Sequence, residues 1–287
     1  MFRAEIGIIG GSGLYHMPGL TNVHEDQVST PFGEPSDWLT FGDLEGHKVA
    51  FLARHGRGHC LLPSDINYRA NIHAMKQVGV SAILSVSAVG SLKEEHRPAE
   101  FIIPDQFIDR TYARRSTFFG TDVVAHVSMA EPVCPSLSRT LEAACVLSEV
   151  PAKRGGTYVC IEGPQFSTRA ESNLYRSWGA DIIGMTNMQE AKLAREAEIC
   201  YATLAMVTDY DCWHPGHDSV TTEQIVEVLA KNSAAASRVV RAAVAGFSAK
   251  RMCHCQSALK DAIITKPSVI SFVTRQKLRL LLSKYVQ

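Results

Sequence analysis

Short apolar segments alternate with amphipathic segments along most of the chain, and this alternation limits the possible folds more than any other feature. The apolar segments have the length of buried strands and run into loops of small residues, whereas the amphipathic segments repeat with helical spacing. Buried strands joined by helices indicate an α/β fold, with a mostly parallel or mixed sheet flanked by helices. The predicted strands are 6–9, 48–52, 81–86, 101–107, 156–161, 181–185 and 200–208, and the predicted helices are 67–78, 136–147, 169–178, 189–197 and 222–245.

The 287 residues contain no internal repeat and no linker that would divide the chain, so the sequence predicts one domain. We assign residues 1–250 to this domain. Residues 251–287 form a more basic C-terminal tail, which ends in a helix predicted over 277–285.

The charges of the chain balance, with 29 lysines and arginines against 29 aspartates and glutamates. A neutral chain offers no electrostatic attraction to nucleic acid or to an anionic membrane, so an anionic ligand must be bound by a local site. No apolar run approaches the ~20 residues of a membrane-spanning helix, and the N-terminus lacks the pattern of a secretory signal. We therefore expect a cytoplasmic protein that binds neither nucleic acid nor membrane.

Four predicted strand ends carry groups that suit an oxyanion. The first is the loop Gly10-Gly-Ser-Gly13, whose backbone N–H groups and serine hydroxyl can approach an anion closely. It matches neither the dinucleotide-binding fingerprint nor the lysine-containing phosphate loop. Because the ends of neighbouring strands meet at one edge of a sheet, the four together predict a phosphate pocket. Its candidate ligands are Ser12, Arg54, His55, Ser87, Ala88 and Thr186.

Asp209 and Asp211 follow the apolar strand predicted over 200–208. A spacing of two in an extended segment places both carboxylates on one side. A departing purine needs a proton at N7 and a partner for its exocyclic group, and carboxylates suit both roles. Phe166 and Met185 supply an aromatic ring and a thioether that could sandwich a base, although both are also typical of a core.

The eight cysteines are mostly scattered. Cys145, Cys160 and Cys200 lie in apolar segments and are predicted to be small core residues. Cys253 and Cys255 form the one local cluster, and the sequence around it lacks the second pair that a structural zinc site requires. We expect a polar surface turn there, and whether these two thiols pair stays open.

Seven motifs, spread in order from residue 6 to about residue 244, resemble the methylthioadenosine phosphorylases, which are trimeric members of the purine nucleoside phosphorylase superfamily. The motifs are IGIIGGSG, TPFGEPSD, ARHGR, NYRANI, IEGPQFSTRAES, GMTNMQEAKLARE and TDYDCWH. The resemblance implies a single-domain fold around a mixed, partly barrel-like sheet. It also implies a homo-oligomer, expected to be a trimer.

The resemblance assigns the six candidate ligands above to phosphate and makes Asp209 and Asp211 the catalytic pair. It places the ribose against Met185, and Thr222 and Ile225 near the 5′-substituent. His126 would reach the site of a neighbouring subunit. The implied nucleoside-binding residues are Phe166, Ser167, Met185, Asp209, Tyr210, Asp211, Thr222, Ile225 and His126.

The implied reaction is the reversible phosphorolysis of 5′-methylthioadenosine to adenine and 5-methylthioribose 1-phosphate, in methionine and purine salvage. Inorganic phosphate would be a co-substrate, with no metal and no organic cofactor. The alternative is a phosphorylase for 6-oxopurine nucleosides or methylthioinosine, which needs a donor to O6, such as asparagine, where this chain has Asp209.

Two alternatives come from other classes of protein. A dinucleotide-dependent dehydrogenase would rest on the loop Gly10–Gly13 alone, and a non-catalytic nucleoside-binding protein is disfavoured by the intact phosphate set.

The chain also departs from the family at two positions. Ser12 stands where threonine is frequent, which keeps the hydroxyl, and Gly184 stands where some members carry asparagine.

Overall fold

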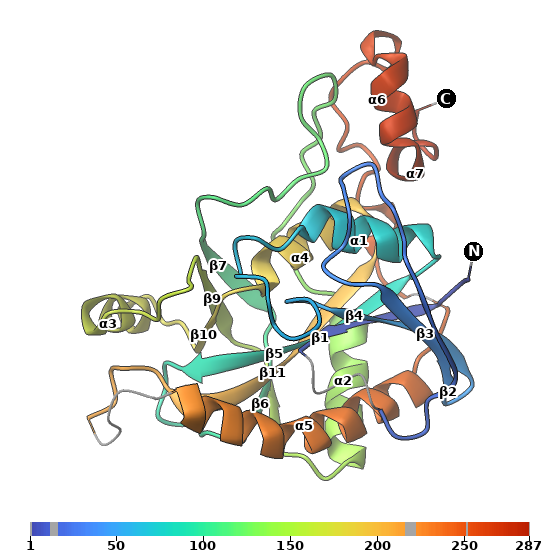
Figure 1. Cartoon of the computed structure of the whole chain (residues 1–287). Helices are drawn as coiled ribbons and strands as arrows, with labels where there is room; N and C mark the ends of the chain where they lie inside the picture. The colour runs from blue at the N-terminus through green and yellow to red at the C-terminus, as the bar shows by residue number, and fades with distance from the viewer. Residues whose placement is uncertain (1, 12–16, 216–221, 251, 287) are drawn as a thin grey trace.

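The structure, a computed structural model, describes residues 2–11, 17–215, 222–250 and 252–286, with backbone alone for 222–231 (Figure 1). Its strands are β1 (Ile6–Gly10), β2 (Thr21–Asp26), β3 (Leu39–Leu44), β4 (His47–Ala53), β5 (Ala82–Ser91), β6 (Phe101–Ile103), β7 (Gln106–Arg110), β8 (Ala152–Arg154), β9 (Thr157–Ile161), β10 (Ile182–Gly184) and β11 (Cys200–Tyr210). Its helices include α1 (Tyr68–Gln77), α2 (Pro135–Leu147), α3 (Arg169–Ser177), α4 (Asn187–Glu196), α5 (Thr222–Ala245), α6 (Phe272–Lys277) and α7 (Arg279–Leu282).

Strand β5 is the centre of one mixed sheet. Along one edge, its first half pairs in parallel with β1, and its end pairs antiparallel with β10 at Gly90 and Ser91. Along the other edge, β11 pairs in parallel with the whole of β5. The strand therefore changes its neighbour along one edge, where pairing stops at Ser85 and resumes at Gly90, while it stays paired with β11 along the other.

Two bent strands close part of this sheet into a barrel. β6 and β7 form one bent run that pairs in parallel with β8 and β9, and the register continues across the bend, with Ile103 opposite Arg154 and Gln106 opposite Thr157. The bend passes through Gly155 and Gly156, whose φ values of 98° and 114° favour glycine. β6 also pairs with β11, and β9 with β10, so the circuit returns to β5 from both sides. The predicted mixed, partly barrel-like sheet is confirmed.

Helices cover the sheet on two sides, as the sequence predicts (Figure 1). α1 packs against α4, and α2 packs against α5. Ile72 and Met75 of α1 are fully buried in one apolar cluster, and Leu141 of α2 and Val240 of α5 are fully buried in another. Within the described part of the chain, no helix combines the length and the apolar character that a membrane crossing requires.

The strands differ from the prediction where pairing, rather than local pattern, determines their length. β5 continues to Ser91 and β11 to Tyr210, because each keeps a hydrogen-bonded neighbour beyond the apolar run. Ser87 and Ala88 therefore lie inside a strand and not at a strand end, which corrects the sequence prediction. β2, β3 and β8 were not predicted: β2 is a polar and largely exposed edge strand, β8 is three exposed residues, and Gly42 and Asp43 interrupt the apolar run of β3.

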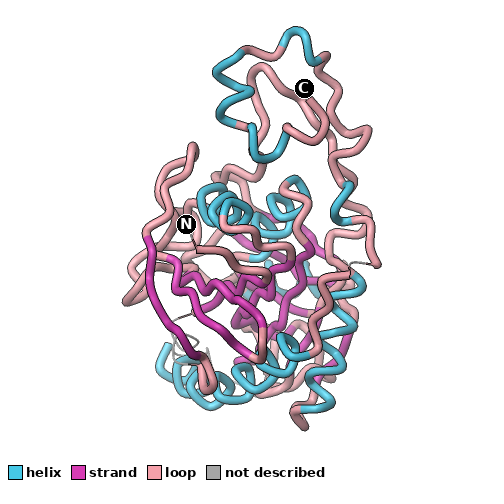
Figure 2. The backbone as a smooth tube through the Cα atoms, turned by 90° about the vertical axis from the view of Figure 1, so that its right-hand side faces the viewer, coloured by secondary structure: helices cyan, strands magenta, loops and turns pink. Residues whose placement is uncertain are grey.

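The C-terminal tail packs onto the main fold. Leu259, Ile270, Leu278 and Leu281 belong to the same apolar cluster as α1. The single helix predicted over 277–285 is wrong, because α6 ends at Lys277 and α7 begins at Arg279. Figure 2 shows the two short helices at one end of the molecule, apart from the sheet.

A long loop between β7 and α2 extends beside the tail, and we call residues 111–134 the arm (Figure 1). Ala125 forms a bridge with Ile263, and the His126 amide donates to the Ala262 carbonyl at 2.9 Å. At its base, the hydroxyl of Thr117 and the amide of Phe118 both donate to the buried Glu196 carboxylate at 2.7 Å. The arm and the tail thus form one projecting unit.

Candidate active site

Thr186 is positioned beside Ser87 by the antiparallel pairing of β10 and β5. Ile183 lies opposite Gly90, so the chain that follows β10 runs back along β5 toward Ser87 and Ala88. Thr186 then becomes the N-cap residue of α4, and its side chain makes no capping hydrogen bond. The N-terminus of a helix carries partial positive charge and backbone donors, which stabilise an anion. This part of the site therefore suits phosphate.

Arg54 lies beneath this end of the site and is 3% exposed. Its Nε donates to Glu190 Oε1 at 2.5 Å, its Nη2 donates to Ser85 Oγ at 2.7 Å and to Glu190 Oε2 at 3.2 Å, and its Nη1 donates to the Val86 carbonyl at 2.9 Å. Glu190 is 1% exposed, so the two charges form a buried ion pair. These contacts use most of the guanidinium donors and leave one N–H of Nη1 for a further acceptor.

His55 is half-buried beside Arg54, and it stacks on His59 with ring centroids 4.2 Å apart. Burial lowers the pKa of His55 to about 4. The hydrogen bond to the Leu61 carbonyl raises this pKa, but its effect is smaller than that of burial. The ring is therefore neutral at neutral pH. Because Nδ1 lies 2.9 Å from that carbonyl oxygen, Nδ1 carries the proton and Nε2 is an acceptor.

Asp209 and Asp211 lie together at the end of β11. A Cβ atom built on Gly90 would be 3.3 Å from Asp209 Oδ2 and 3.6 Å from Asp211 Cβ, so both aspartates lie against this glycine. The Thr208 hydroxyl donates to Asp209 Oδ1 at 2.5 Å. Burial raises the pKa of Asp209 to about 6; the Thr208 hydrogen bond opposes this rise, and the Asp211 charge adds to it. Asp209 can therefore hold a proton closer to neutral pH than an ordinary aspartate.

The loop after β9 lies against Met185 and near the aspartates. A Cβ atom on Gly163 would lie 2.5 Å from Met185 Sδ, and the Cys212 thiol contacts the Ser167 carbonyl at 3.3 Å. Phe166 is 61% exposed on this loop. The Ser167 Oγ atom is buried without a hydrogen-bond partner among the described residues, and burial raises the pKa of the Asp211 carboxylate, whose hydrogen bond with Ser172 opposes that rise. Buried polar atoms of this kind are normally satisfied, which is what a bound ligand would do.

The two ends of the site are separated by a length of strand. Ser87 pairs with Ala205, and Gly90 pairs with Asp209. Three residues of strand span roughly 10 Å. Between these ends Ala88 and Gly90 are partly exposed, although the strand before them is fully buried. The end that suits an anion and the end that carries the carboxylates are therefore about one nucleoside apart.

Some of the predicted site residues lie elsewhere. Tyr210 alternates with the two aspartates, and its hydroxyl donates to the Glu94 carbonyl at 3.1 Å. His126 is exposed on the arm. Ser12 lies outside the described residues, as do the side chains of Thr222 and Ile225 at the start of α5.

Arg114 connects several segments of the site by hydrogen bonds, and it was not predicted to be a site residue. Its side chain is 1% exposed, and it donates to Glu162 Oε1 at 3.2 Å, to Gln189 Oε1 at 3.0 Å and to the Met185 carbonyl. It therefore connects the arm, the loop after β9 and the start of α4. Its sequence neighbourhood, Tyr112 to Arg115, is typical of an exposed basic loop.

Gly184 is required by the packing of the barrel interior. A Cβ atom at this position would collide with the hydroxyl of Tyr158, which is fully buried. The asparagine carried by some family members could not occupy this place beside Tyr158. The replacement of the asparagine of some family members by Gly184 is therefore accompanied by a large side chain, Tyr158, in the adjacent space.

Comparison with known proteins gives a consistent result. Residues 5–245 match the phosphorylase superfamily model. The S-methyl-5′-thioadenosine phosphorylase of Koribacter versatilis (strain Ellin345) is 65% identical over 283 residues, covering 99% of this chain and 97% of the relative.

Solved structures agree with this comparison. A methylthioadenosine phosphorylase from an Antarctic soil metagenomic library has a TM-score of 0.94 at 52% identity, over 98% of this chain and 100% of that one. A variant of the adenosine/methylthioadenosine phosphorylase of Schistosoma mansoni, in complex with methylthioadenosine, has a TM-score of 0.84 at 36% identity, over 90% and 96% of the two chains.

A partly closed mixed sheet, with a helix start that suits an anion beside the middle of β5 and two carboxylates further along the β5–β11 pair, is a nucleoside phosphorylase architecture, and the chain belongs to the phosphorylase superfamily. Within that superfamily, it belongs to the S-methyl-5′-thioadenosine phosphorylases. The resemblance drawn from the seven motifs is confirmed.

Arg54 and Arg57 flank the same short motif, and we predict that their replacement has very different costs. Arg54→Ala leaves the Glu190 carboxylate buried and unpaired, a change that costs about 3–5 kcal/mol and lowers the thermal midpoint by roughly 6–20 °C. Arg57→Ala removes the ion pairs of an exposed arginine with Glu25 and Asp37 and should cost at most about 1 kcal/mol. Differential scanning calorimetry measures both.

The double variant Arg54→Met/Glu190→Met is the control for a charge effect. Because it removes both charges at once, it should recover most of the stability lost in Arg54→Ala. Equal midpoints for Arg54→Ala and Arg57→Ala would contradict the buried ion pair.

Proposed function

We propose that this protein catalyses the reversible phosphorolysis of 5′-methylthioadenosine, giving adenine and 5-methylthioribose 1-phosphate. The observation that carries the proposal is the register of β5, β10 and β11, which puts Thr186 and Ser87 about one nucleoside length from Asp209. The names of the relatives and the methylthioadenosine complex of the Schistosoma mansoni enzyme support the same substrate. The reaction belongs to methionine and purine salvage in the cytoplasm.

Phosphate binds at the start of α4 in this proposal. The hydroxyls of Ser87 and Thr186, the backbone around Ala88 and the remaining N–H of Arg54 donate to its oxygens. His55 Nε2 accepts the hydrogen that monohydrogen phosphate carries, and Ser12 completes the set. Holding phosphate below the anomeric carbon saves the entropy of bringing the reactants together.

The glycosidic bond breaks as phosphate attacks the anomeric carbon. The C1′–N9 bonding electrons leave with adenine, a C1′–O bond to phosphate forms, and positive charge develops on the ribose. The phosphate anion stabilises this charge from one side. Met185 and Phe166 hold the ribose and the base, and Ser167 lies beside the base. No metal and no organic cofactor takes part in these steps.

The aspartates act on the departing base. Protonated Asp209 donates to N7 as negative charge develops on the purine, and its other oxygen shares with the Asp211 carboxylate the hydrogen bonds that the exocyclic amino group donates. A 6-oxopurine presents a carbonyl at that position, which an ionised carboxylate repels. Adenine is therefore preferred over hypoxanthine, and the proposal favours methylthioadenosine over methylthioinosine.

The active form in this proposal is a homotrimer, in which the arm of one subunit brings His126 to the site of its neighbour. Large apolar side chains are exposed on the adjoining tail, and such patches are typical of interaction surfaces. They include Ile264, Val269, Phe272 and Val273, each at least 65% exposed. The proposal keeps Thr222 and Ile225 as the residues near the 5′-substituent.

The Thr186 hydroxyl offers a clean test of the phosphate site. Thr186→Val keeps the shape of the side chain but removes a donor to a charged ligand, which is worth about 1.5–3 kcal/mol. The KM for phosphate should rise roughly 10-fold to 100-fold, whereas the KM for the nucleoside stays near the wild-type value. Thr186→Ser keeps the hydroxyl and is the matched control. Equal increases in both KM values would remove Thr186 from the phosphate site.

Base preference tests Asp209. An asparagine amide at this position would donate to O6, so Asp209→Asn should lower kcat/KM for methylthioadenosine and raise the relative value for methylthioinosine. The measurement is the ratio of the two specificity constants before and after substitution, with Asp211→Asn measured in parallel. A ratio that moves in neither variant would contradict base recognition by the aspartates.

The pH profile provides a second readout of Asp209. Its pKa of about 6 means that the proton needed at N7 is present below pH 6 and is lost as the pH rises through this value. At saturating phosphate, kcat/KM for the nucleoside should therefore fall across this range, and this limb should vanish in Asp209→Asn.

Complementation between inactive subunits tests the trimer. His126→Ala and Asp209→Asn subunits are each expected to have low activity. If His126 serves a neighbouring site, subunits refolded together form some sites with both residues intact, and activity should reappear. Mixed subunits that stay inactive, or a fully active monomer in light scattering, would overturn the shared site.

A further inference from the structure

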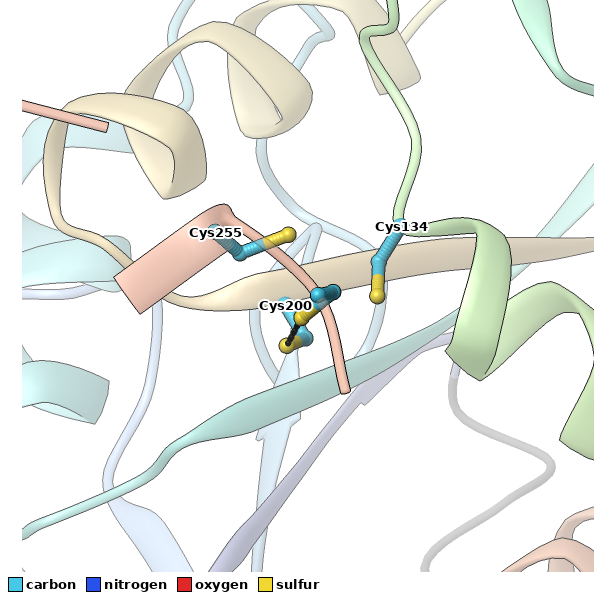
Figure 3. Close-up of side chains that lie close together, drawn as sticks. Cys134, Cys200 and Cys255 are labelled. Carbon is cyan, nitrogen blue, oxygen red and sulfur yellow. Dashed lines mark hydrogen bonds between the residues drawn. The ribbon is translucent and has the colours of Figure 1, made fainter. Parts of the chain in front are cut away.

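Four cysteines from distant parts of the sequence meet in the folded chain. Cys134 precedes α2, Cys200 begins β11, and Cys253 and Cys255 lie at the start of the tail. Their four Sγ atoms all lie within 4.8 Å of one another, and the Cys200 and Cys253 sulfurs are 3.4 Å apart (Figure 3). This corrects the expected polar surface turn, because Cys134 and Cys200 supply the second pair that the local sequence lacks.

The arrangement fits one tetrahedral metal ion. A Zn–S bond of ~2.3 Å places the four sulfurs of a tetrahedral site about 3.8 Å apart. The Cys200 and Cys253 sulfurs are 3.4 Å apart and no pair of the four is more than 4.8 Å apart, which one ion at their centre could accommodate with small shifts. All eight cysteines of the chain are free thiols in the structure. Soft thiolate ligands select zinc over the hard cations that prefer oxygen.

We propose that Cys134, Cys200, Cys253 and Cys255 bind one zinc ion, which fastens the C-terminal tail to the phosphorylase fold. Four protein ligands leave no open position, so the site is structural and not catalytic. Zinc replaces the four thiol protons, which are released to solvent.

The surroundings of the cluster suit a bound zinc–thiolate centre. Cys134, Cys200 and Cys255 are at most 4% exposed and lie in the apolar cluster under α2 and α5. Four thiolates and Zn²⁺ carry a net charge of −2, which burial alone would disfavour. The Nη1 of Arg195 lies 3.8 Å from Cys255 Sγ, and Cys134 is the N-cap residue of α2, at the positive end of that helix. Both partly balance the charge.

Access to the cluster is available from one side. Cys134, Cys200 and Cys253 line a surface groove of about 540 Å³ between α2 and the end of α5. Metal can therefore enter and leave the folded chain without the opening of the sheet.

The zinc centre lies at the opposite end of β11 from the active site. Cys200 and Asp209 are nine positions apart along the strand, which corresponds to roughly 30 Å. Loss of the metal should therefore loosen the tail and lower thermal stability while the chemistry at Asp209 continues in folded protein. This inference does not depend on the identity of the substrate.

Metal content tests the proposal directly. Full-length protein purified under reducing conditions, without an affinity tag that binds metal, is analysed by inductively coupled plasma mass spectrometry before and after incubation with ZnCl₂ and dialysis. We expect about one zinc per chain for wild type and for the control Cys60→Ser, and near zero for Cys253→Ser/Cys255→Ser. A chelator should lower the thermal midpoint of wild type but not that of the double variant.

Cobalt substitution is a readout that does not rely on a folded variant. Co²⁺ added to reduced, metal-free wild type should give the intense thiolate charge-transfer and visible bands of tetrahedral cobalt. The proposal is overturned by three results: zinc content below a tenth of the chain concentration after reconstitution, equal zinc in wild type and double variant, or disulfides among these four cysteines in protein isolated with its thiols trapped by alkylation.

Discussion

The buried ion pair between Arg54 and Glu190 is the interaction on which the proposed phosphate end of the site depends. Two charged side chains with almost no exposure are stable in the interior only if their other polar atoms also have hydrogen-bond partners, as those of Arg54 and Glu190 do. The pair connects the end of β4, the middle of β5 and helix α4, and Tyr201 of β11 adds a hydrogen bond to Glu190 at 2.8 Å. Asn187, the first residue of α4, donates to Ser85, Tyr201 and Thr203. The network therefore fixes the position of the N-terminus of α4 against β5, on the side of Ser87.

The base end depends on strand pairing instead of charge. β5 exchanges β1 for β10 along one edge, and this exchange opens the floor of the site at Ala88 and Gly90. Because β11 stays paired with β5 throughout, Asp209 comes to rest against Gly90, where burial raises its pKa. One polar network and one pair of strands thus fix the two ends of the site at a nucleoside's distance.

Local pattern predicted most of the strands and helices, and it predicted the alternation that puts Asp209 and Asp211 on one side. It missed the residues whose roles depend on distant partners. Glu190 is 136 positions from Arg54 and sits in a segment of strong helix formers, so it was not singled out as a buried charge. Cys200 was predicted to be a core residue, because nothing in its neighbourhood indicates Cys253, 53 positions later. Arg114 was missed for the same reason.

The most direct test of the account is product analysis with 5′-methylthioadenosine in the presence and absence of inorganic phosphate. The account predicts that adenine appears only with phosphate, in equal amount with 5-methylthioribose 1-phosphate, and that one phosphate is consumed for each adenine released. Adenine release without phosphate, or free 5-methylthioribose as the sugar product, would show hydrolysis and would contradict the account.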